Sequence, residues 1–117
     1  MRYLCLVRAE DTAFAALTPD EKRALDRESL AYDRELERGG HFVAADVLQP
    51  VAEAVTVRVR DGRLAVTDGP FAETKEQLGG FILIEARDMN EAIRLGAGIP
   101  MARFGSIEVR PILKLEA

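Results

Sequence analysis

The sequence contains few of the residues on which metal, redox and thiol chemistry usually depend. Its 117 residues include one cysteine, one histidine and no tryptophan. One cysteine excludes an internal disulfide, which fits a reducing cytoplasm, and Cys5 lies in an apolar run typical of an inert core thiol. The single histidine, His41, weakens a zinc-site interpretation because such sites usually use several His or Cys ligands. We therefore expect no metal site and no cofactor.

Long apolar runs and a basic surface are also missing. No uninterrupted apolar segment approaches the roughly 18 residues that cross a bilayer, and the N-terminus lacks the form of a signal peptide. The net charge is −4, with acidic and basic residues interleaved. We expect a cytoplasmic protein with no membrane partner and no direct nucleic-acid partner. Its composition, 48% apolar and 31% charged, predicts one folded domain over residues 1–117.

The remaining pattern predicts four strands and two helices. Strands are expected at residues 2–7, 41–45, 81–84 and 106–112, of which 2–7 and 81–84 are apolar on both faces and therefore central. A helix over residues 19–38 is expected to begin with a capping box of Thr18 and Glu21. Its predicted apolar stripe is Leu25, Ser29, Tyr32 and Leu36, in which Ser29 is the unexpected polar member.

A second helix is expected to begin at Asp88, which with Glu91 repeats the capping pattern. Its predicted inward-facing residues share a helical spacing; they are Met89, Ala92, Ile93 and Gly96.

Residues 55–60 and 63–67 alternate between apolar and polar on either side of Asp61-Gly62. This pattern predicts a β-hairpin with a two-residue type I′ turn. The resulting register places Val55 opposite Asp68, so that the Asp68 carboxylate lies on the apolar face of the hairpin. A carboxylate on an apolar face needs a partner or a function.

The order of these elements predicts a ferredoxin-like α+β sandwich with an inserted β-hairpin and two helices on one face of an antiparallel sheet. Such a sheet has a second face that no helix covers. Because the central strands are apolar on both faces, we expect a homodimer in which two sheets pack face to face.

Residues 67–81, TDGPFAETKEQLGGF, together with Val109-Arg110-Pro111-Ile112, resemble the DGPF branch of the YCII-related proteins. The resemblance extends over nearly the whole chain. It implies a dimeric α+β barrel of ferredoxin-like subunits in the bacterial cytoplasm, and it brings no established reaction. Members of the branch are often described as encoded beside sigma factors of the extracytoplasmic-function class, which implies a regulatory setting.

Better-studied relatives in the same family are thought to use a His-Asp pair, and counting from the nearby glycine and proline places these positions at Ser29 and Ile99. Neither residue is retained, so the chemistry of that pair is not expected here. Ser29 is either what remains of the older pocket or a hydroxyl bonded to a carbonyl one helical turn earlier.

Asp68 is the first candidate for chemistry. It is either a general base or ligand-fixing carboxylate, or a cap that accepts N–H bonds from the Gly69-Pro70 turn. The charged residues Glu73, Lys75 and Glu76 are expected to lie on one helical turn. That turn is either a solvated face or, through Lys75, part of an anion site or a partner for Asp68.

Glu108 and Arg110 alternate with apolar residues on the last strand and are expected to point into the space between subunits. The Arg110 guanidinium there suits a carboxylate or phosphate. The alternative is that both residues bond their counterparts across the dimer.

Together these residues predict a site for a small anionic metabolite near the dimer interface. Asp68 is the candidate catalytic residue, and the expected substrate-binding residues are Lys75, Arg110, Glu108, Phe71, Tyr3 and Ser29. As an enzyme, the protein would be a cofactor-free acid/base catalyst. The alternatives are a non-catalytic ligand-binding or regulatory module linked to sigma-factor-type transcription control, and a dimer whose motif is purely structural.

Overall fold

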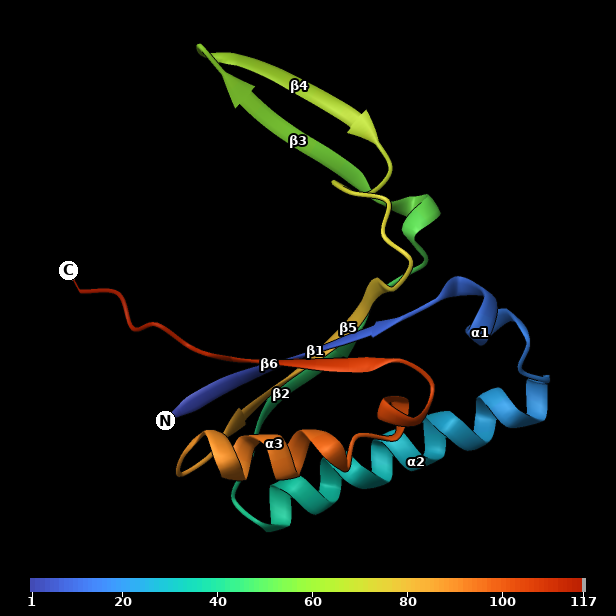
Figure 1. Ribbon diagram of the computed structural model, residues 1–117, viewed down its shortest axis with the longest axis vertical. Helices are drawn as coiled ribbons and strands as arrows, with labels where there is room; N and C mark the ends of the chain where they lie inside the picture. Colours follow the sequence, from blue (N-terminus) through green and yellow to red (C-terminus); the bar gives the residue numbers. More distant parts are fainter. Residues whose placement is uncertain (117) are drawn as a thin grey trace.

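The computed structural model describes residues 1–116 (Figure 1). It has an α+β architecture with an antiparallel sheet, as the sequence predicted. The strands are β1 (Arg2–Ala9), β2 (Phe42–Val47), β3 (Val55–Arg60), β4 (Arg63–Asp68), β5 (Gln77–Glu85) and β6 (Ser106–Pro111). The helices are α1 (Asp11–Ala15), α2 (Pro19–Arg38) and α3 (Met89–Ala97), with short 3-10 helices at Val51–Glu53 and Pro100–Arg103. None of the helices within residues 1–116 combines the length and the apolar character needed to cross a bilayer.

The main sheet has the strand order β2-β5-β1-β6, and each neighbouring pair is antiparallel. The two segments predicted to be central are β1 and β5, which confirms that prediction. Alternate residues of these strands, among them Cys5, Ile82 and Ile84, are buried on the face that carries α2 and α3. The core therefore lies between the sheet and the two longer helices.

The opposite face of the sheet has no helix on it (Figure 1). On this face the edge strand β2 contributes Ala44 and Asp46, the partners of Leu83 and Phe81. On β5, β1 and β6, the strand register places seven residues there: Leu4, Leu83 and Arg110, then Leu6, Phe81 and Glu108, and then Arg8. We call these seven residues the open sheet face. Its leucines and Phe81 are half-buried in the single chain.

Helix α2 has the predicted bounds and the predicted start. The backbone N–H of Glu21 donates to Thr18 Oγ1 at 3.1 Å, and the N–H of Thr18 donates to Glu21 Oε1 at 2.9 Å. These two bonds satisfy groups that the first helical turn leaves unpaired. The predicted capping box is confirmed.

Helix α3 differs from the prediction in two details. Asp88 caps the helix by accepting from the backbone N–H of Glu91, but the Glu91 carboxylate accepts in return from the N–H of Arg87 rather than from that of Asp88. Ile93 is 53% exposed, so the prediction that it faces inward is wrong. Ala92 and Gly96 meet the sheet, whereas Ile93 lies on the flank of the helix. Helix α1 lies between the first predicted strand and the first predicted helix, in a segment for which the sequence predicted no helix or strand.

The β3–β4 hairpin has the predicted register, with Val57 opposite Val66 and Val55 opposite Asp68. Asp61 and Gly62 have φ values of 53° and 73°, as a type I′ turn requires. We call this hairpin, residues 55–68, the arm. It extends away from the main sheet on the side of the open sheet face, opposite to α2 and α3 (Figure 1).

Glu91 is the one charged residue that is buried in the described part of the chain. Its carboxylate accepts the Arg87 N–H at 2.8 Å and lies 3.3 Å from Arg87 Nη1 and 3.2 Å from Arg94 Nη2. The backbone hydrogen bond and then the neighbouring cations hold the pKa of the Glu91 carboxyl below its ordinary value, although desolvation opposes them.

Replacing Glu91 by Gln is expected to lower the melting temperature at pH 7 and to lower it much less at pH 3. A carboxyl group whose pKa is depressed by folding stabilises the fold above its unfolded-state pKa, and this contribution is lost as the pH falls through the folded-state pKa. The melting temperatures of the wild type and Glu91→Gln, measured between pH 7 and pH 3, should therefore converge below about pH 4. The exposed Glu53→Gln is the control, and a pH-independent difference for Glu91→Gln would contradict the assignment.

Candidate functional site

The Asp68-Gly69-Pro70-Phe71 motif forms the base of the arm. Gly69 has a φ of +96°, which L-residues with a side chain rarely adopt. Its backbone N–H donates to Ala54 O at 2.7 Å, and its carbonyl accepts from Thr56 Oγ1 at 2.9 Å. Backbone and hydroxyl groups of the arm thus hold the motif's turn against the start of β3.

Residues 70–76 form an irregular loop, so the helical turn expected over Glu73, Lys75 and Glu76 is wrong. The Gln77 side-chain amide donates to Ala72 O at 3.2 Å and to Thr74 O at 3.0 Å. Thr74 Oγ1 donates to Glu76 O at 2.8 Å. Side chains therefore occupy the carbonyls that the backbone N–H groups of a helix would have used.

Asp68 lies on the apolar face of the arm, exposed and opposite Val55. Within residues 1–116 its carboxylate has no hydrogen bond and no ion pair, including none to the turn that follows it. The interpretation of Asp68 as a turn cap therefore lacks the bonds it requires, because the Gly69 N–H donates to Ala54 O instead.

Lys75 does not contact Asp68. Its Nζ lies 3.5 Å from Glu10 Oε1 at the end of β1, and its side chain is largely exposed. Both residues line an open hollow of about 380 Å³ beneath the motif loop, together with Asp11, Pro70 and Glu73. Because three carboxylates surround this one ammonium group, the hollow is poorly suited to an anion. The part played by Glu10 was not predicted, since only tertiary structure brings it to Lys75.

Glu108 and Arg110 lie on the open sheet face, as the alternation of their strand predicted, and Arg8 joins them there. Arg8 Nε is 3.2 Å from Glu108 Oε1, and Arg110 Nε is 4.0 Å from Glu108 Oε2. We call this row the charge ladder. Two guanidinium groups share one carboxylate, which leaves one positive charge in excess within this row. The Asp46 carboxylate lies on the same face of the sheet, but on β2, two strands away from Glu108. Arg8 was missed because its position diagonal to Glu108 depends on the β1–β6 register.

Beside the charge ladder lies an apolar strip made of the remaining members of the open sheet face: Leu4, Leu6, Phe81 and Leu83. The Arg110 side chain is 69% exposed, so its guanidinium remains available to a partner. A cation at the edge of an apolar strip can bind a molecule that carries both an anionic group and a carbon skeleton.

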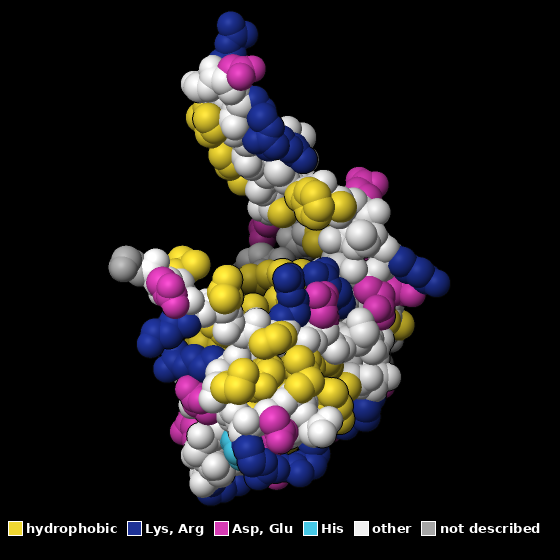
Figure 2. All heavy atoms as spheres, turned by 60° about the vertical axis from the view of Figure 1, so that its left-hand side comes forward, with side chains coloured by type: hydrophobic (Ala, Val, Ile, Leu, Met, Phe, Trp, Pro, Cys, Tyr) yellow, Lys and Arg dark blue, Asp and Glu magenta, His cyan; other side chains and the backbone are white. Residues whose placement is uncertain are grey.

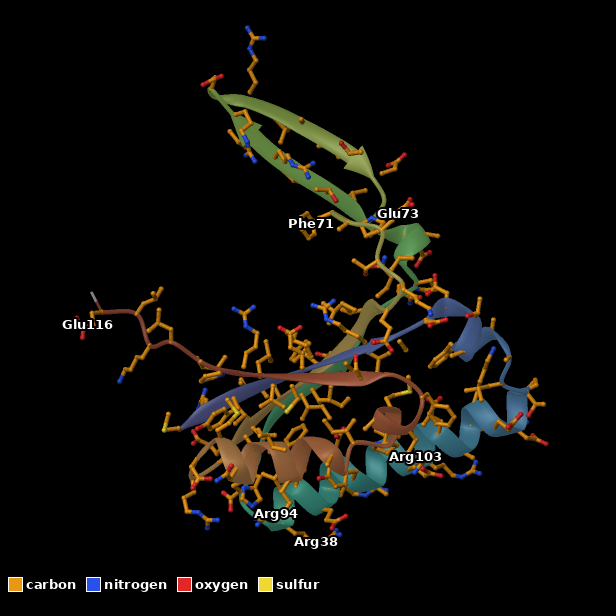
Figure 3. All side chains as sticks on the ribbon, viewed as in Figure 1. Arg38, Phe71, Glu73, Arg94, Arg103 and Glu116 are labelled. Carbon is orange, nitrogen blue, oxygen red and sulfur yellow. The ribbon has the colours of Figure 1, made fainter. Side chains whose placement is uncertain are left out.

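The other predicted site residues lie elsewhere. Tyr3 is 2% exposed and faces the helices, so the sheet separates it from Arg110. Ser29 is half-buried on α2, also on the helix side. Phe71 is 81% exposed and projects from the base of the arm into the space above the sheet (Figure 3). One chain therefore does not gather the predicted residues into a single pocket.

Two further features limit the chemistry of the described residues. Burial raises the pKa of the Cys5 thiol to about 11, which disfavours a thiolate nucleophile. Within residues 1–116, no group of three or more His, Cys, Asp or Glu side chains is placed to hold a metal ion.

A second open hollow, of about 440 Å³, lies between α3 and β6 and is lined by small and apolar residues such as Met89, Ile93 and Val109.

The amino-acid sequence is similar to those of known proteins. The YCII-related domain matches residues 1–116. An uncharacterized protein of Rhizobium meliloti (strain 1021) is 35% identical over 114 residues, which cover 96% of this chain and 92% of that protein. The matched region includes the main sheet, both longer helices, the arm and its motif.

Two substitutions separate the backbone role of the motif from the role of its carboxylate. Gly69→Ala should destabilise the fold by about 1 kcal/mol, because the left-handed backbone is strained for alanine. A Cβ at Gly69 would meet no atom within 4 Å, so this cost does not include a clash. Asp68→Asn should change stability by less than about 0.5 kcal/mol, as for an exposed residue without contacts. Urea denaturation measures both, and a loss from Asp68→Asn as large as that from Gly69→Ala would make the carboxylate structural.

Proposed function

The chain belongs to the YCII-related domain family, and from that premise we propose that it forms a homodimer which binds a small anionic molecule between its two open sheet faces. The strand order β2-β5-β1-β6, with both longer helices on one face, supports a ferredoxin-like subunit. A second copy is the simplest layer to cover the open sheet face, since it presents the same apolar strip.

The observation that carries the proposal is the excess positive charge of the charge ladder. A second sheet about 10 Å away would exclude most water from this row. An uncompensated guanidinium then costs several kcal/mol, whereas a carboxylate or phosphate that accepts two parallel N–H bonds compensates it. Arg110 is the anion-binding residue of this proposal, and Glu108 holds it and Arg8 in place.

As an enzyme, the dimer would catalyse a cofactor-free proton transfer in the bound molecule. Asp68 is the candidate to accept and return the proton, and the exposed Phe71 ring supplies an apolar wall beside it. The proposal leaves out Lys75, which faces the acidic hollow, and also Tyr3 and Ser29, which lie on the helix side of the sheet.

The second candidate is a non-catalytic ligand-binding or regulatory module of the cytoplasm, linked to sigma-factor-type transcription control. The position of Asp68 favours this candidate. In the single chain its carboxylate lies on the open surface of the arm, whereas a general base usually works in a site that excludes water. The same anion site serves both candidates, and turnover of the bound molecule distinguishes them.

Thermal-shift and native mass-spectrometry measurements with inorganic phosphate and a series of mono-, di- and tricarboxylates test the anion site. A ligand of the wild-type protein should bind Arg110→Gln about 10- to 100-fold more weakly, because a charge-assisted hydrogen-bond pair is lost. Arg34→Gln, which removes an exposed arginine from α2, is the matched control and should bind normally.

The outcome also decides between the two candidates. A ligand that Asp68→Asn still binds but no longer converts indicates an enzyme, and a bound ligand that the wild type never converts indicates a binding module. If the wild type and Arg110→Gln bind every anion with equal affinity, the charge ladder is not part of the binding site.

A further inference from the structure

We propose that the arm of each subunit packs its apolar face against the second copy of the chain, so that two exchanged arms close the dimer on the open sheet faces. This inference rests on the homodimer of the proposed function and goes beyond it by assigning the arm. It makes the arm an interaction surface whose occupant is another molecule of the same protein.

The two faces of the arm differ in polarity. Val55, Val57, Val59 and Val66 are each 58% exposed and Leu64 is 69% exposed, and the register places all five on one face. The other face carries three arginines: Arg58, Arg60 and Arg63. Figure 2 shows these classes separated, with hydrophobic side chains along one side of the arm and Lys or Arg side chains along the other.

The apolar face of the arm is expected to pack against another layer of protein. A two-stranded hairpin is only marginally stable in water unless a further layer packs against it. Here the arm stands clear of the rest of residues 1–116, and its valines have no layer of their own chain to pack on (Figure 1). A row of large apolar residues in this state marks a contact with another molecule.

The position of the arm indicates which molecule that is. The arm extends on the side of the open sheet face, so the two surfaces border the same space (Figure 1). A copy of the chain seated on the open sheet face would therefore lie next to the arm. By two-fold symmetry, its own arm would contact the first subunit in the same way.

The area required by a stable dimer supports this arrangement. Four strands about 4.8 Å apart, each about 20 Å long, give the open face of the sheet a projected area of roughly 400 Å². A standard interface buries roughly 800 Å² on each partner. Because accessible area exceeds projected area, the open sheet face alone supplies at most an interface of about the standard size. The arm adds a second apolar surface of about the same length as the strands of the sheet.

Arm packing would also complete the site. Asp68 and Phe71 stand at the base of the arm, where they have no contact with the charge ladder of their own chain. Packing of the arms against the second copy would bring the base of each arm to the edge of the space between the sheets. The candidate proton-transfer group and the anion-binding group would then belong to one enclosed site.

Two neighbouring substitutions on β4 test the arm without touching the open sheet face. Val66→Glu places a carboxylate on the apolar face, opposite Val57, and Ala65→Glu places the same group on the polar face, opposite Arg58. Both positions are exposed in the single chain, so neither change removes a core contact. The dimer dissociation constant, from native mass spectrometry and sedimentation over a dilution series, should rise about a hundredfold for Val66→Glu, because each dimer buries two unpaired carboxylates. Ala65→Glu should stay within about threefold of the wild type.

The outcomes separate this inference from the proposed function. If the wild type is a monomer at every concentration, the homodimer fails and the arm contact fails with it. If the wild type is a dimer that Val66→Glu and Ala65→Glu weaken equally, the arm contact alone is wrong and the anion site between the sheets stands.

Thiol labelling provides a second measurement that does not depend on a disruptive substitution. The natural Cys5 is buried and gives little background. A cysteine at Val57 should react at least about tenfold more slowly in the concentrated dimer than after dilution, whereas one at Ala65 should react equally under both conditions. Equal reaction of the Val57 cysteine at both concentrations would overturn the arm contact.

Discussion

The structure depends on one imbalance: its two central strands are apolar on both faces, but the chain supplies helices for only one. On the helix side, Cys5 and Ile84 are almost completely buried beneath α2 and α3. On the other side, leucines of β1 and β5 and Phe81 are half-buried, and no helix of residues 1–116 lies over them. Because burial of apolar area is the main stabilising contribution to folding and association, this imbalance favours a second layer.

The polar residues follow the same division. Glu91 is buried on the helix side, and a backbone N–H and two guanidinium groups compensate its charge. On the open side, the charge ladder has two guanidinium groups for one carboxylate. A buried charge must be paired, whereas an exposed one can rely on water. The excess charge of Arg110 is therefore tolerated in a single chain. In the homodimer proposed above, a second sheet would cover it and make it a binding group.

Local signals in the sequence were reliable where neighbours in the chain decide the structure. The hairpin register and the start of α2 were predicted because Asp61-Gly62 and the Thr18/Glu21 box act over a few residues. The helical turn expected over residues 73–76 was wrong because Gln77 and Thr74 bind the carbonyls of that loop, and charge density alone does not predict such bonds. Ile93 was misplaced because the helical spacing identifies an apolar stripe but not its limits.

The sequence by itself determined the two longer helices, the arm, the side of the arm on which Asp68 lies and the place of each strand, since these follow from periodicity and capping. The start of β5 was predicted at Phe81, whereas the strand begins at Gln77. Tertiary structure decided which side chains meet. The β1–β6 register placed Arg8 beside Glu108, the fold brought Glu10 to Lys75, and the sheet separated Tyr3 from Arg110. Contacts between residues far apart in the chain depend on strand order and register, and both are set by the packing of the whole core rather than by any one segment.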